Sequence, residues 1–292
     1  MEPKLLNTRD YQLIGQLNLK AGRRMVGLVS GEQNSPARGG GIEFADYREY
    51  QAGDDITRVD WAVFLRSRRL LIRLCAEEKE LTLLLMLDIS RSMRFGDPDK
   101  LWAARRITAI LAGIALNGGN RTGVITMGKQ LQELLPPGPS RITLAGIVNA
   151  LERIEPVENI NPQACMRQFA SRYSRKCMVV MISDLLFPEW DQVITGLAAT
   201  GCESYVIQIL APQELQPPQL GEVTLVDLES ADEVSLHMDY PVIHEYRKVV
   251  ADFLNETRQT CGRQGLGYSL ALTDIPLSRI LHRELKNGGL LC

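Results

Sequence analysis

The sequence has little net charge and no long apolar segment, and both absences exclude classes of protein. Its 292 residues carry a formal net charge of −2, so no overall field favours nucleic acid or an anionic membrane. No apolar run approaches the length of a membrane span, and the first residues do not resemble a signal peptide. We therefore expect a cytoplasmic protein with no membrane insertion and no nucleic-acid partner.

Common catalytic motifs are missing as well. The chain has no P-loop, no GxSxG nucleophile elbow and no GxGxxG after the first buried strand. Its three histidines lie in the C-terminal fifth without HExxH spacing, and its six cysteines form no CxxC pair. These absences argue against the common hydrolase, zinc-protease and dinucleotide-binding classes, and reduced, mostly buried thiols are expected.

What the sequence does contain is an apolar run, residues 81–87, that ends in oxygen-bearing side chains. Asp88, Ser90 and Ser92 follow it at every second position. Such a run predicts a strand buried on both faces, and ligands gather outside the carboxyl ends of strands in open α/β sheets. A carboxylate and two hydroxyls suit a hard cation such as Mg2+. The alternative is that Asp88 caps the next helix and that the serines bind turn amides.

Strand and helix patterns alternate after this point. Apolar runs predict strands at 122–128, 131–135, 177–184, 204–210, 223–228 and 267–273, and helical spacing predicts helices at 100–116, 144–154, 162–173, 190–199, 242–261 and 277–285. The alternation predicts an α/β fold with a doubly wound, mostly parallel sheet and helices on both faces, over residues 78–292. Residues 1–77 are predicted to form an N-terminal extension with a small β-rich segment.

The extension gathers charges of both signs near aromatic residues. This set can form a docking surface for a partner, or its charges can satisfy one another. We favour internal pairing, since clustered opposite charges usually neutralise each other. The residues concerned are Arg48, Asp54, Asp55, Arg58 and Asp60, with Trp61 expected to anchor the small sheet.

A second apolar run ends in Ser183 and Asp184. In a doubly wound sheet, Asp88 and Asp184 would point into the same crevice. Thr143 precedes a predicted helix and is a third hydroxyl candidate, although Ser140 competes for that role. Because hydroxyls are neutral ligands, an ion held there would keep positive charge and could accept a carboxylate from another molecule. The arrangement suits binding better than bond cleavage.

The segment Asp88-Ile89-Ser90-Arg91-Ser92 resembles the DxSxS motif of von Willebrand factor A domains. The metal-ion-dependent adhesion site of those domains also uses a Thr and a later Asp. The resemblance implies a von Willebrand A-like fold and Mg2+ or Mn2+ held by Asp88, Ser90, Ser92, Thr143 and Asp184. One departure is Leu185, which stands where such domains often have Gly.

A wider set of motifs resembles the bacterial family catalogued as domain of unknown function fifty-eight, over about residues 25–285. The motifs are Glu43-Phe44, Arg48-Glu49-Tyr50, Gly53-Asp54-Asp55, Arg58, Asp60-Trp61, DxSxS and Thr273-Asp274-Ile275-Pro276-Leu277. Members are von Willebrand A-like proteins, often encoded beside MoxR-type AAA+ ATPases. The resemblance implies chaperone-like assembly or maturation with such an ATPase, with this partner or a client supplying Glu or Asp to the metal.

The main enzyme alternative is a Mg-dependent phosphatase of the haloacid-dehalogenase type, which also ends a first strand in Asp. That chemistry needs a second Asp two residues later as the acid for the leaving group. Ser90 occupies this position. We therefore expect a non-enzymatic, metal-dependent protein-interaction module.

Overall fold

The computed structural model describes residues 4–20, 43–76, 81–137, 142–173, 177–216, 220–226 and 233–292. The chain divides into two compact units, of which the smaller is Gly22–Glu80 and the larger joins Met1–Ala21 to Leu81–Cys292. This division differs from the predicted extension 1–77, because the start of the chain packs with the large unit.

The large unit is built on a six-stranded sheet with the spatial order β10-β7-β6-β3-β4-β5. Its strands are β3 (Thr82–Asp88), β4 (Arg121–Met127), β5 (Leu131–Leu135), β6 (Met178–Ser183), β7 (Glu203–Leu210) and β10 (Gly267–Leu272). All neighbouring pairs are parallel except β4 with the edge strand β5. From β3 the chain proceeds to one edge, returns to β6 beside β3, and then proceeds to the other edge. The strand order therefore reverses between β3 and β6, at the two central strands.

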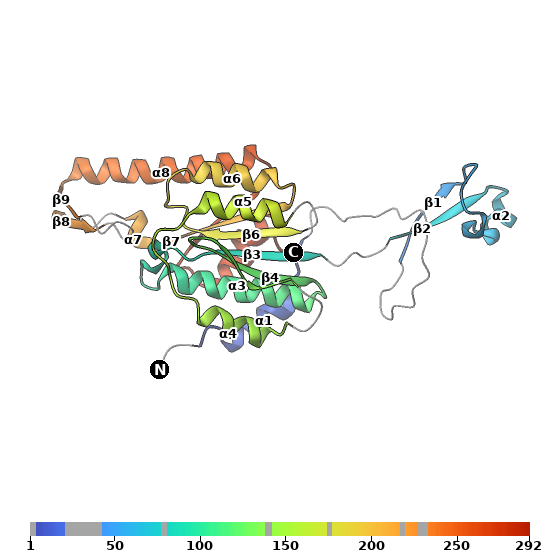
Figure 1. Ribbon diagram of the computed structural model, residues 1–292, viewed down its shortest axis with the longest axis horizontal. Coiled ribbons are helices and arrows are strands. Elements are labelled where there is room, and N and C mark those ends of the chain that lie inside the picture. The colour runs from blue at the N-terminus through green and yellow to red at the C-terminus, as the bar shows by residue number, and fades with distance from the viewer. Residues whose placement is uncertain are drawn as a thin grey trace. The chain divides into compact units, whose positions relative to one another are not determined.

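Helices cover both faces of this sheet (Figure 1). On one face lie α1 (Thr8–Gln16), α3 (Lys100–Asn117), α4 (Leu144–Glu152), the short α9 (Leu277–Arg279) and the π-helical turn η3 (Ile280–Leu285). On the other lie α5 (Pro162–Arg172), α6 (Trp190–Ala199) and the C-terminal half of α8 (Tyr240–Arg263). The predicted fold class, α/β with a doubly wound, mostly parallel sheet and helices on both faces, is confirmed.

The sequence of β3 explains its central position. Its side chains alternate between the two helical layers: Leu83, Leu85 and Leu87 pack in one apolar cluster, and Leu84 and Met86 in the other. All five are fully buried. A strand that is apolar on both faces is stable only between two layers of helices, so β3 lies in the middle of the sheet. Its last residue, Asp88, is polar and lies at the carboxyl end of the strand.

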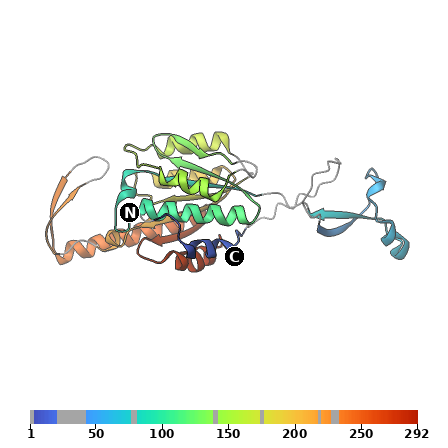
Figure 2. The ribbon, with the colours of Figure 1, turned by 90° about the horizontal axis from the view of Figure 1, so that it is seen from below.

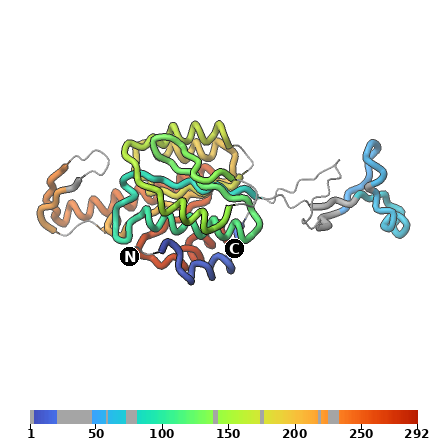
Figure 3. Tube along the Cα trace, turned by 60° about the horizontal axis from the view of Figure 1, so that its bottom comes forward, coloured from blue at the N-terminus to red at the C-terminus, as the bar shows by residue number. Residues whose placement is uncertain are grey.

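The N-terminal segment closes one side of the large unit. Helix α1 packs on α3, and its buried side chains Leu13 and Ile14 belong to the same apolar cluster as that helix. Leu19 then forms an antiparallel bridge with Leu291, so the segment runs beside the C-terminus (Figures 2 and 3). This packing is the physical reason that the start of the chain belongs with the sheet.

A two-stranded hairpin precedes α8 (Figure 3). It pairs β8 (Gly221–Val226) with β9 (Glu233–Met238), and the short helix α7 (Pro212–Leu215) lies between it and β7. Strand β8 was predicted, but β9 and α7 were not. Across the described parts of the chain, no helix combines the length and apolar character needed to cross a membrane.

The small unit pairs β1 (Glu43–Glu49) with β2 (Leu71–Ala76), and carries the 3-10 turn η1 (Ile56–Arg58) and helix α2 (Trp61–Ser67). Arg48 binds both oxygens of Asp54 at 2.6 and 2.7 Å, which agrees with the expected pairing. Asp60 instead accepts from Tyr47 at 2.9 Å and caps α2. Trp61 is 50% exposed, so the expectation that it anchors the sheet is wrong. The side chain of Arg58 lies outside the described part.

Candidate metal site at the ends of the central strands

The two central strands end side by side in polar residues. Asp88 is the last residue of β3 and Ser183 the last of β6, and the register pairs Leu87 with Ile182. Asp184 follows directly. These residues therefore lie where the strand order reverses, which is the position at which doubly wound sheets bind ligands.

Asp88 is a buried carboxylate held by neutral donors. Its Oδ1 accepts from the amide of Ser90 at 2.8 Å, and its Oδ2 accepts from the Ser183 hydroxyl at 2.5 Å. Burial, with a further contribution from the charge of Asp184, raises the pKa of Asp88 to about 7. No ion pair joins Asp88 to a cation in the described ranges. The site therefore contains a carboxylate whose charge is not neutralised by a direct partner.

Two serine hydroxyls lie next to this carboxylate in the chain. The Oγ atoms of Ser90 and Ser92 are 2.9 Å apart. Ser90 is 1% exposed, whereas Ser92, in the 3-10 turn η2 (Arg91–Arg94), is partly exposed. The structure thus brings together three of the predicted ligands, Asp88, Ser90 and Ser92. The alternative had Asp88 capping the next helix and the serines binding turn amides. Asp88 does accept from one turn amide, that of Ser90, whereas Ser90, which begins the turn η2, makes no capping hydrogen bond with its side chain.

Asp184 has a different environment, because a lysine binds it. Its Oδ1 accepts from the amide of Leu186 at 3.0 Å, and its Oδ2 accepts from Lys100 Nζ at 2.6 Å. The same ammonium donates to Glu214 in α7. Lys100 is 0% exposed. Burial raises the pKa of Glu214, and the charge of Lys100 opposes that rise.

Sequence reasoning assigned no role in the site to Ser183, Lys100 or Glu214. A signal for Lys100 was present, since it is the first residue of α3, where the helix dipole disfavours a cation. Because α3 is also largely buried, a lysine at its first position needs carboxylate partners to compensate its charge. The Ser183 hydroxyl was also apparent in the sequence, but its hydrogen bond to Asp88 on the neighbouring strand was not.

Thr143 serves another purpose in this structure. It is exposed and caps α4, with its Oγ1 accepting from the amide of Gly146 at 3.1 Å. No hydrogen bond links it to Asp88 or the two serines in the described part of the chain. Ser140, its competitor for the same role, lies outside the described residues. A ligand role for Thr143 stays a prediction.

The backbone after Asp184 has an unusual conformation. Leu185 adopts φ +61° while its side chain is fully buried. This left-handed conformation favours Gly, the residue that the resemblance expected here. The chain therefore keeps a glycine-type turn beside the site although it carries Leu, and strained residues of this kind cluster at functional sites.

The donors around Asp88 fit a hard divalent cation. Carboxylate and hydroxyl oxygens, together with water, are what Mg2+ takes in proteins. Asp88, Asp184 and Glu214, when ionised, exceed Lys100 by two negative charges. No three His, Cys, Asp or Glu side chains converge as ligands among the described residues, so a metal here would depend on the serines.

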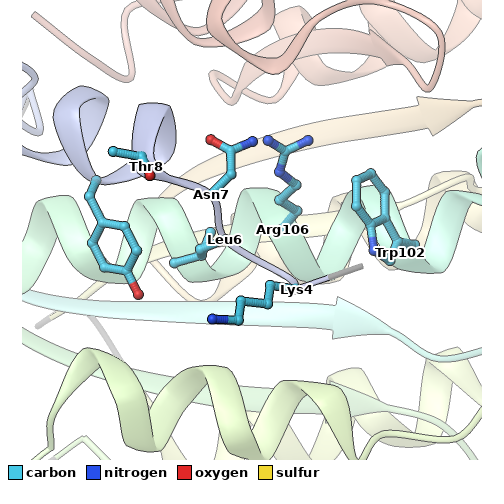
Figure 4. A pocket seen from close by; sticks show the side chains of 7 residues that line it. Lys4, Leu6, Asn7, Thr8, Trp102 and Arg106 are labelled. Carbon is cyan, nitrogen blue, oxygen red and sulfur yellow. The ribbon is translucent and has the colours of Figure 1, made fainter. Parts of the chain in front are cut away.

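A pocket elsewhere does not offer comparable chemistry (Figure 4). It lies between the residues leading into α1 and the exposed side of α3. Its lining residues are Lys4, Leu6, Asn7, Thr8, Tyr11, Trp102 and Arg106. Two of the polar side chains that line the pocket already have partners. The guanidinium of Arg106 donates to Asp10, and the side chain of Asn7 caps α1.

Comparison with known proteins places the chain in a family. The family model described as "Protein of unknown function DUF58" matches residues 46–256. Uncharacterized proteins of Mycobacterium tuberculosis and Mycobacterium bovis are 27% identical over 273 residues, covering 84% of this chain and 80% of each relative.

Among solved structures, a conserved hypothetical protein BatB from Bacteroides thetaiotaomicron has a TM-score of 0.43 at 14% identity, covering 71% of this chain and 98% of that one. An aerotolerance-related membrane protein from Bacteroides fragilis has a TM-score of 0.43 at 17% identity, covering 71% and 99%. The family match spans well over half of the 292 residues, and the chain therefore belongs to the DUF58 family of proteins of unknown function.

Proposed function

We propose that this protein is a metal-dependent protein-interaction module whose site binds Mg2+ or Mn2+. One observation supports it above the others: Asp88 is buried at the strand-order reversal, has no cation partner among the residues that the structure describes, and lies next to the hydroxyls of Ser90 and Ser92. A buried, ionised carboxylate is costly unless a cation compensates it. A divalent ion would supply that charge.

Each residue would have a definite role in this site. Asp88 would provide the charged ligand, and Ser90 and Ser92 the neutral ones. The partly exposed Ser92 lies at the side from which another protein could approach. A Glu or Asp of that protein would complete the coordination, so that recognition depends on the ion.

The chemistry of the site favours binding over catalysis. Ser90 stands where a phosphatase of the haloacid-dehalogenase type would need its acid. The hydroxyl of Ser90 lies 2.9 Å from that of Ser92 and also donates to the Asp88 carboxylate, and a serine hydroxyl does not supply the acidic proton that such a leaving group needs. We therefore propose a non-enzymatic role.

The proposed partner is a MoxR-type AAA+ ATPase or its client, acting in chaperone-like assembly or maturation. This rests on the resemblance drawn from the sequence. An ATP-driven partner would place the interaction in the cytoplasm.

The test is binding of the MoxR-type ATPase of the same organism to immobilised protein, in Mg2+ or in chelator. We expect retention by the wild type in Mg2+, loss with chelator, and loss in Asp88→Ala. The matched control Asp252→Ala removes an exposed carboxylate of α8 and should bind as the wild type does. Retention that ignores both chelator and Asp88→Ala would refute the proposal, and Asp88-dependent phosphatase turnover would replace it.

A further inference from the structure

Lys100 is a fully buried cation placed between two carboxylates beside the proposed metal site. Its Nζ is 2.6 Å from Asp184 Oδ2 and also binds Oε1 of Glu214. A buried ammonium without partners would be strongly disfavoured, and these two carboxylates compensate it. The pair of contacts joins the start of α3, the loop after β6 and the helix α7.

Both carboxylates are oriented toward the lysine by backbone amides. Asp184 accepts from the Leu186 amide at 3.0 Å through its other oxygen. Glu214 accepts from the Ala211 amide at 2.7 Å through its other oxygen. With one oxygen fixed by the backbone, each carboxylate presents the remaining one to Lys100. The arrangement is a built ion-pair network rather than a chance contact.

We propose that Lys100 is the resident counter-cation of this site and withholds Asp184 from a bound divalent ion. The ion then takes only Asp88, Ser90 and Ser92 from this chain. With a single carboxylate ligand, its affinity is low until a partner carboxylate joins it. Lys100 thereby makes tight metal binding depend on the partner, while the isolated chain binds the ion weakly. The inference rests on the proposed function, because it assumes that a divalent ion binds at Asp88.

The test is the dissociation constant for Mn2+ measured on the isolated full chain. Lys100→Met keeps the apolar stem of the side chain but removes the ammonium, so Asp184 becomes available as a second carboxylate ligand. We expect Mn2+ to bind this variant roughly tenfold or more tightly than the wild type. Adding Asp184→Asn to Lys100→Met should abolish the gain.

A matched control separates direct competition from a general change in charge. Lys129 is exposed and follows β4, another strand of the same sheet. Lys129→Met removes the same charge and should leave the Mn2+ affinity within about twofold, because exposed charges are screened by solvent and salt. An equal gain in both variants would overturn the role of Lys100.

The outcomes also separate this inference from the proposed function. If wild type and Lys100→Met bind Mn2+ equally and Asp88→Ala does not bind, the metal site stands and the role of Lys100 is wrong. If neither the wild type nor Lys100→Met binds Mn2+, the proposed function fails and this inference fails with it.

A second measurement covers the case that Lys100→Met does not fold. A crystal structure of the wild type grown with Mn2+ should show the ion on Asp88, Ser90 and Ser92, with Lys100 still bound to Asp184. An ion coordinated directly by Asp184, with the lysine displaced, would overturn the inference.

Discussion

At the scale of single residues, the environment of Asp88 has a consequence for stability. Its pKa is raised from an ordinary 3.8 to about 7, first by burial and then by the charge of Asp184. The folded protein therefore holds this proton more tightly than the unfolded chain does. As pH rises from about 4 to about 7, the unfolded chain ionises first, so the stability contributed by the neutral carboxyl is progressively lost.

Asp88→Asn should remove this pH dependence. In chelator, we expect the free energy of unfolding of the variant, relative to the wild type, to rise by at least about 1 kcal/mol between pH 4.5 and pH 8. Urea denaturation at the two pH values measures the difference, and a constant difference would show that Asp88 titrates normally.

Leu185 combines buried packing with left-handed backbone, and the two effects can be separated. Leu185→Ala loses packing at a cost of about 2–5 kcal/mol. Leu185→Gly loses the same packing but relieves a strain of about 1–2 kcal/mol. Denaturation should find both variants destabilised, with the Gly variant the more stable by roughly 1 kcal/mol.

Leu197 provides the control for this order. It is equally buried but lies within α6, where a helical backbone favours Ala over Gly by about 1 kcal/mol. Leu197→Gly should therefore be less stable than Leu197→Ala. The same order at both positions would mean that the conformation of Leu185 carries no strain.

At the scale of elements, the attachment of α1 to α3 is the feature that the sequence placed in the wrong unit. Asp10 is 2% exposed and binds the guanidinium of Arg106 through both of its oxygens, at 2.8 and 2.9 Å. It also accepts from the amide of Asn7 at 2.8 Å, which completes a capping box. Asp10 and its partner Arg106 are 96 positions apart in sequence, so no local pattern indicates where this helix docks.

Asp10→Ala should weaken this attachment. It leaves the partly buried Arg106 without its carboxylate and removes one cap of α1, which together cost about 2–4 kcal/mol. Arg9→Ala, at an exposed position on the same helix, should change the free energy of unfolding by no more than about 0.5 kcal/mol. Equal effects in the two variants would show that α1 contributes nothing through Asp10.

The elements that sequence reasoning predicted well have strong internal periodicity. Helix α3 was predicted over 100–116 and is observed over Lys100–Asn117, with Asp99 as its cap. Strand β9 was missed because its short alternation of apolar and polar residues is stabilised by pairing with β8. Helix α2 was missed as well, since the extension was predicted to contain only a small β-rich segment.

At the scale of the whole molecule, the parts of the site that local sequence patterns specify were predicted. The parts that depend on contacts between distant elements were missed. Asp88, Ser90 and Ser92 are adjacent in sequence, and the rule for strand ends brings Asp184 to the same rim. Lys100 comes from a different element, and its partners lie 84 and 114 positions away. No pattern in the sequence specifies such pairs, because they depend on how helices pack over the ends of the strands.

The central claim is that the carboxylate at the end of β3 binds a divalent cation, and calorimetric titration of Mn2+ into the wild type and Asp88→Ala tests it most directly. The account predicts saturable binding of one ion to the wild type above pH 7, where Asp88 is ionised, and no binding to the variant. Equal heats for the two proteins would contradict it.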